Sequence, residues 1–143
     1  MKTVVCGVGN RLRGDDAFGP LVIDAFESRN KNVLFLDCGS APENFIGKVM
    51  HAAPEKIIIV DAFDMKQKPG TICRIDLDKI QNTSYSTHNA PLSMFVKAFK
   101  DSCAEVIIIG FQPETIEFGK EVSSETRIAV EKTKAMIENL IQS

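Results

Sequence analysis

The feature that most constrains the fold is a run of four β-branched residues, Ile57–Val60, which ends on Asp61. A run without polar residues is typical of a strand that is buried on both faces of a sheet. Three further apolar runs stand at Val4–Val8, Val33–Leu36 and Val106–Ile109. We therefore expect a sheet of several buried strands with Ile57–Val60 at its centre.

Segments with helical periodicity separate these runs. Apolar residues recur three or four positions apart, which predicts helices around residues 20–26, 43–53, 92–99 and 124–141. Ser123 or Ser124 is suited to cap the last of them, because a serine side chain accepts a hydrogen bond from the first turn. Each buried strand is therefore followed by a helix that can cover the sheet.

The segment Thr71–Leu77 has a different pattern, with Arg74 and Asp76 between apolar neighbours. This alternation predicts an edge strand with one wet face, and its direction could be antiparallel. Strands that alternate with helices indicate a three-layer α/β/α sandwich with about five mostly parallel strands. The 143 residues suffice for a single domain, 1–143.

Composition and charge exclude several classes of protein. A share of 44% hydrophobic residues supports an ordinary core, and a net charge of -2 with scattered basic residues argues against nucleic acid as a partner. No apolar run approaches the ~18 residues that span a bilayer, and no signal peptide is visible. We therefore expect a cytoplasmic protein without membrane insertion. The four cysteines form no C-x-x-C pair, so we expect each to be reduced and buried.

Polar residues follow three of the predicted strands. The first loop ends in Asp15 and Asp16, Asp61 follows the central run, and His88 comes after the predicted edge strand. Because parallel strands end at the same edge of a sheet, we expect Asp16, Asp61 and His88 to converge. Two carboxylates and an imidazole suit nickel, zinc or manganese and leave coordination positions open.

Each of these residues also has an ordinary structural explanation. Asp15 or Asp16 could close an Asx turn, Asp61 could cap a helical turn, and His88 could be an exposed loop residue. Asp37 and Asp61 both end buried strands, where they would be removed from water, so either could carry a proton as well as hold a ligand. No serine, threonine or cysteine is tied by spacing to a base, so no nucleophile is apparent.

A dinucleotide site in the first loop is disfavoured. Gly7 and Gly9 begin a G-x-G-x-x-G pattern, but Leu12 occupies the position of the third glycine. The adjacent Asp15 and Asp16 would also repel a pyrophosphate. We therefore expect no permanent organic cofactor.

Five short motifs extend from the first loop to residue 113. They are Gly7–Asn10 with Gly14–Asp16 and Gly19–Pro20, Asp37–Asn44, Ile59–Ala62 with Asp64–Met65, Thr87–Asn89 with Pro91–Leu92, and Gln112–Pro113. In this order they resemble the nickel-iron hydrogenase maturation endopeptidases, which trim the C-terminal extension from a hydrogenase large subunit. The longest motifs are most similar to the branch that serves the hydrogenase of the formate hydrogenlyase complex.

This resemblance implies an α/β/α fold and an aspartic-type peptidase by the family's convention. It also implies metal binding by Asp16, Asp61 and His88, with Asp37 as a further catalytic candidate. The nickel would be supplied by the substrate, because the family is thought to recognise nickel that is already inserted in the large-subunit precursor. The expected partner is therefore the nickel-loaded precursor, and we expect the free protein to be a monomer.

Two residues depart from the family pattern. Ala17 and Cys38 stand where the family has glycine, and Cys38 adds a thiol near the predicted metal position, although we expect it to be unligated. Two other functions stay open on the sequence alone. One is a self-contained hydrolase with its own zinc, and the other is a non-enzymatic chaperone for the nickel site.

Overall fold

The computed structural model describes residues 2–26, 31–76 and 89–143. Its strands form one five-stranded sheet within these residues, in the order β2-β1-β3-β5-β4. The strands are β1 (Thr3–Val8), β2 (Val33–Gly39), β3 (Lys56–Ala62), β4 (Ile72–Ile75) and β5 (Glu105–Phe111). The first four in this spatial order are parallel, and β4 pairs antiparallel with β5 at the edge. Both the central position of Ile57–Val60 and the antiparallel edge strand are confirmed.

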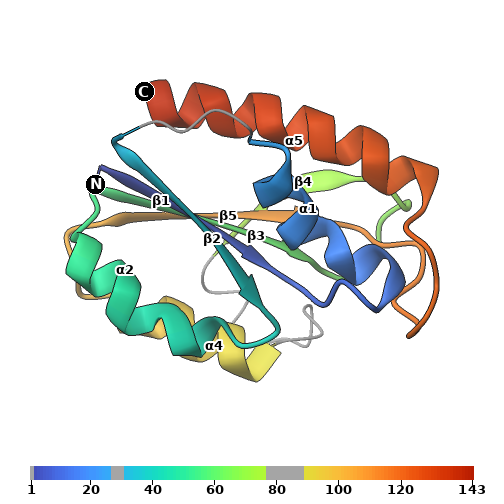
Figure 1. Cartoon of the computed structure of the whole chain (residues 1–143), viewed down its shortest axis with the longest axis horizontal. Helices are drawn as coiled ribbons and strands as arrows, with labels where there is room; N and C mark the ends of the chain where they lie inside the picture. The colour runs from blue at the N-terminus through green and yellow to red at the C-terminus, as the bar shows by residue number, and fades with distance from the viewer. Residues whose placement is uncertain (1, 27–30, 77–88) are drawn as a thin grey trace.

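Helices cover both faces of the sheet (Figure 1). They are α1 (Phe18–Asp24), α2 (Ile46–Ala52), α4 (Asn89–Ala98) and α5 (Ser124–Gln142), with the 3-10 turns η1 (Gly14–Ala17) and η2 (Pro42–Phe45) before α1 and α2. On one face Ile58 and Val60 pack with α1 and α5, and on the other Ile57 and Ile59 pack with α2 and α4. The strand β3 is therefore buried from both sides, which confirms the three-layer sandwich.

The start of α1 lies against the carboxyl ends of β1 and β3. A Cβ atom on Gly19 would overlap the carbonyl oxygens of Val8 and Val60, so only glycine permits this approach. As a result, the segment that carries Asp16 is held over the end of the sheet. No helix in the described part of the chain is both long and apolar enough to cross a membrane.

Candidate active site

Asp16 is fully buried in η1, at the carboxyl edge of the sheet. Its Oδ2 accepts a hydrogen bond from the backbone N–H of Asn10 at 3.0 Å. A Cβ atom on Gly9 would overlap the carbonyl oxygen of Asp16, so glycine at position 9 lets the two backbone segments touch. The first loop thus folds back on itself and fixes the position of this carboxylate.

Asp61 lies at the carboxyl end of β3 and is also fully buried. Its Oδ1 accepts a hydrogen bond from the N–H of Ala62 at 2.8 Å. Asp16 is three residues before Gly19, and Gly19 packs on Val60, the residue before Asp61. The structure therefore brings two buried carboxyl groups to the same edge of the sheet, as expected for residues that follow parallel strands.

The third predicted metal ligand, His88, lies outside the described residues. The helix α4 begins at Asn89, directly after it, and packs against η2, the turn that leaves β2. Within residues 2–26, 31–76 and 89–143, no three His, Cys, Asp or Glu side chains form a group that could hold a metal ion. The convergence of Asp16, Asp61 and His88 thus stays a prediction.

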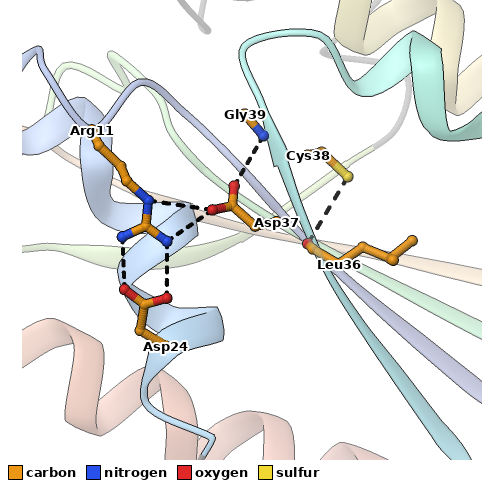
Figure 2. Close-up of polar contacts among 6 residues, drawn as sticks. All are labelled: Arg11, Asp24, Leu36, Asp37, Cys38 and Gly39. Carbon is orange, nitrogen blue, oxygen red and sulfur yellow. Dashed lines mark hydrogen bonds and ion pairs between the residues drawn. The ribbon is translucent and has the colours of Figure 1, made fainter.

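Asp37 differs from the sequence-based expectation. Its side chain is 37% exposed, and its Oδ2 lies 2.8 Å from Nη2 of Arg11 (Figure 2). The expectation that Asp37 would be removed from water is wrong, because β2 is the outermost strand on its side of the sheet and residue 37 faces solvent. The position of Asp37 at the carboxyl end of β2 is as expected, and its catalytic role stays a prediction.

Arg11 connects three parts of this edge, as Figure 2 shows. Its Nη1 and Nη2 donate to the two oxygens of Asp24 at 2.7 and 2.8 Å, and Nε and Nη2 donate to Asp37. The first loop, the last residue of α1 and the end of β2 are thereby joined. The guanidinium lowers the pKa of Asp24 by hydrogen bonding, and both carboxylates raise the pKa of Arg11. Sequence reasoning missed Arg11, because its partners lie 13 and 26 residues away.

Asp15 has a different role from its neighbour Asp16. It is buried, and it accepts hydrogen bonds from the N–H of Ser123 at 2.8 Å, the hydroxyl of Ser123 at 2.9 Å and the N–H of Glu114 at 2.9 Å. Burial alone raises the pKa of Asp15, but hydrogen bonds from Ser123, Thr126 and Glu114 outweigh it and bring the pKa below its usual value. Ser123 in turn caps α5 by accepting from the N–H of Thr126, which confirms Ser123 as the cap. Asp15 therefore joins η1 to α5 and is structural.

Gln112 fixes the loop after β3. Its Oε1 accepts hydrogen bonds from the N–H groups of Met65 and Gln67 at 2.6 and 3.3 Å. This glutamine belongs to the last of the five motifs, and its side chain is nearly buried. The motif at residues 112–113 thus supports the chain that follows Asp61.

Two of the four cysteine thiols, those of Cys6 and Cys38, are part of the core. Cys6 and Cys38 are buried in the layer beneath α2 and α4, and Cys38 points to the other face of β2 from Asp37. A hydrogen bond with Cys38 and burial raise the pKa of Cys6, so its thiol is protonated at neutral pH. All four cysteines are free. The expectation of burial is wrong for Cys103, because it lies in the exposed turn after α4, and Cys73 is half-buried on the edge strand.

Comparison of the sequence with known proteins identifies a family that matches most of this chain. The family model described as hydrogenase maturation protease, HycI, matches residues 22–140. The hydrogenase 3 maturation protease of Escherichia coli is 37% identical over 140 residues, which cover 96% of this chain and 90% of the relative.

Two solved structures share the fold over nearly the whole chain. The crystal structure of the [NiFe] hydrogenase maturation protease HycI from Thermococcus kodakarensis superposes with a TM-score of 0.87 at 30% identity, covering 99% of this chain and 93% of that one. The solution structure of the endopeptidase HycI from Escherichia coli gives 0.86 at 34% identity, covering 97% and 90%. The fold and the resemblance to this family are both confirmed, and this chain belongs to the hydrogenase maturation protease family and is a peptidase.

Proposed function

We propose that this peptidase removes the C-terminal extension of a nickel-iron hydrogenase large-subunit precursor after nickel has been inserted. In this proposal Asp16, Asp61 and His88 bind the nickel that the precursor carries. The observation that supports it most is the pair of fully buried carboxyl groups, Asp16 and Asp61, at one edge of the sheet in a chain of this family. Aspartate side chains are rarely fully buried, because removing each from water is costly.

The donor set fits a metal that arrives with the substrate. Carboxylate and imidazole ligands bind borderline divalent metals, but without a thiolate their affinity is modest. Cys38 does not add a thiolate, because its side chain lies in the core. We therefore expect the protein to purify without nickel and to meet the metal only when the precursor presents it. Three protein ligands would leave coordination positions for the precursor's own side chains.

Nickel bound in this way would position the polypeptide for cleavage. Holding the scissile peptide beside the acidic residues converts a weak encounter into an oriented one. In the hydrolysis itself, water adds to the carbonyl carbon, a carboxylate accepts its proton, and the amine leaves with a proton as the C–N bond breaks. We propose that this proton transfer involves the buried Asp16 and Asp61 and the partly exposed Asp37, all at the carboxyl edge of the sheet. We further propose that the protein works as a monomer in the cytoplasm, where its four free cysteines stay reduced.

The experiment compares two conservative variants on the nickel-loaded precursor. Asp61→Asn replaces the carboxyl group at the edge with an amide of the same shape, whereas Asp101→Asn makes the same change at an exposed position before β5. Intact mass spectrometry of the precursor should show cleavage by the wild type and by Asp101→Asn, and a loss of at least about 100-fold in rate for Asp61→Asn. Equal rates for the two variants would contradict the role of Asp61.

Chelation tests the main alternative, a hydrolase with its own zinc. A self-contained zinc enzyme would contain metal after purification and would lose activity on treatment of the enzyme alone with a chelator. We expect the treated and desalted enzyme to cleave nickel-loaded precursor at the untreated rate.

A further inference from the structure

Leu12 and Phe118 are the two most exposed large hydrophobic residues in the described part of the chain. Their exposed fractions are 62% and 74%. Both lie in loops at the carboxyl edge of the sheet: Leu12 precedes η1, and Phe118 lies between β5 and α5. We refer to this pair as the Leu12–Phe118 rim. Isolated exposed apolar residues are common, so the rim gains meaning only from how it is held and what it borders.

The two loops of the rim are joined by hydrogen bonds. The N–H of Gly119 donates to the carbonyl of Leu12 at 2.8 Å, and Nε of Arg13 donates to the carbonyl of Ile116 at 3.1 Å. The N–H of Asp15 donates to the carbonyl of Thr115 at 2.8 Å. Residues 100 or more positions apart in sequence therefore form one preformed surface. A preformed surface loses little conformational entropy when a partner binds.

The rim is also connected to the carboxylate of Asp16. The side-chain oxygen of Asn10 accepts a hydrogen bond from the N–H of Leu12 at 2.8 Å, and the N–H of Asn10 donates to Oδ2 of Asp16 at 3.0 Å. Two hydrogen bonds through Asn10 thus connect Leu12 to Asp16, a residue of the proposed active site. A polypeptide whose scissile bond lies at Asp16 and Asp61 would pass beside this rim.

We propose that the Leu12–Phe118 rim is the docking surface for an apolar segment of the large-subunit precursor next to its scissile bond. This inference rests on the proposed function. It assigns a contact with the polypeptide of the precursor, in addition to the contact between the metal ligands and its nickel. Aromatic side chains are enriched where proteins contact their partners, and an aliphatic neighbour adds apolar area that binding can bury. Two side chains are too small for a permanent contact with a second copy of this chain, because stable interfaces bury about 1,200–2,000 Å². A substrate that binds transiently and leaves after cleavage fits the rim better.

The test removes both apolar side chains and compares a matched control. The variant Leu12→Ala/Phe118→Ala removes the apolar side chains of the rim, and the control Met50→Ala/Ile128→Ala removes two similarly exposed apolar side chains from α2 and α5. Cleavage of nickel-loaded precursor is measured over a range of precursor concentrations. For the rim variant we expect KM to rise about tenfold or more with kcat changed less than about twofold. The control variant should keep both constants, and both variants should keep the wild-type Tm, because all four side chains are exposed.

Three results would contradict the proposal in distinguishable ways. If the rim variant and the control have the same KM, the rim is not the docking surface, although the proposed function stands. If the wild type leaves nickel-loaded precursor uncut, the proposed function fails and the docking inference fails with it. If sedimentation shows a wild-type dimer that the rim variant abolishes, the rim binds a second copy of the chain instead of the precursor.

Discussion

Replacing Asp15 by asparagine tests how the first loop is held over the sheet. Oδ1 of Asp15 accepts from the N–H of Ser123, and Oδ2 accepts from the N–H of Glu114 and the hydroxyl of Ser123. The amide of asparagine has only one oxygen. Whichever way it turns, its NH2 group must face a backbone N–H, so one partly buried donor loses its partner.

The size of the effect follows from these contacts. A hydrogen bond to a charged group contributes about 1.5–3 kcal/mol, and a buried donor left without a partner costs about 1–3 kcal/mol. We therefore expect Asp15→Asn to lower the free energy of unfolding by about 3 kcal/mol, which corresponds to a fall in Tm of about 10 °C for a domain of this size. Asp101→Asn, at an exposed position, should change the Tm by less than about 2 °C.

The pH dependence gives a second measurement of the same contacts. The pKa of Asp15 is lower in the folded protein than its usual value. Its contribution to stability is therefore complete above the usual pKa of ~3.9 and is lost as the pH falls through the lower, folded value. Urea denaturation should show the full difference between wild type and Asp15→Asn at pH 7 and a smaller difference near pH 3. A variant that melts at the wild-type temperature, or a difference that persists unchanged into acid, would refute this reasoning.

Three other changes test separate parts of the molecule. Arg11→Ala should lower the free energy of unfolding in urea by about 1 kcal/mol or less, with a smaller effect in 1 M salt, because both ion pairs are exposed; a loss above about 2 kcal/mol would contradict this. Gly19→Ala should destabilise the fold by about 3 kcal/mol, seen as a lower Tm or insoluble protein, because its Cβ would overlap the carbonyls of Val8 and Val60. A wild-type Tm would show that the backbone can shift at little cost. His88→Ala should abolish cleavage of nickel-loaded precursor in a mass-spectrometric assay and keep the wild-type Tm; residual cleavage near the wild-type rate would remove His88 from the site.

The fold could be predicted from the sequence because its strands carry a strong pattern. Ile57–Val60 is apolar at every position, and a strand of this kind has to be covered on both faces. The alternation around Arg74 likewise predicted an edge strand, and its antiparallel pairing with β5 followed. These patterns depend on local sequence, so no long-range information was needed to interpret them.

The details of the candidate site depend on contacts between distant residues, and the sequence does not encode these locally. Nothing in the adjacent residues Asp15 and Asp16 indicates that the first binds Ser123 and the second binds Asn10. Asp37 ends an apolar run, yet its side chain meets Arg11 in solvent because β2 is an outer strand. The positions of Asp16 and Asp61 after parallel strands predicted that both lie at the same edge of the sheet. The hydrogen-bond partners of each side chain could be identified only in the folded chain.

The most direct test of the central claim compares one precursor with and without nickel. The wild-type protein is incubated with equal amounts of nickel-loaded and nickel-free large-subunit precursor, and the intact mass of each is followed over time. We expect the nickel-loaded precursor to lose its C-terminal extension and the nickel-free precursor to keep its full mass even with excess enzyme. Cleavage of both at comparable rates would contradict recognition of substrate-bound nickel by Asp16, Asp61 and His88.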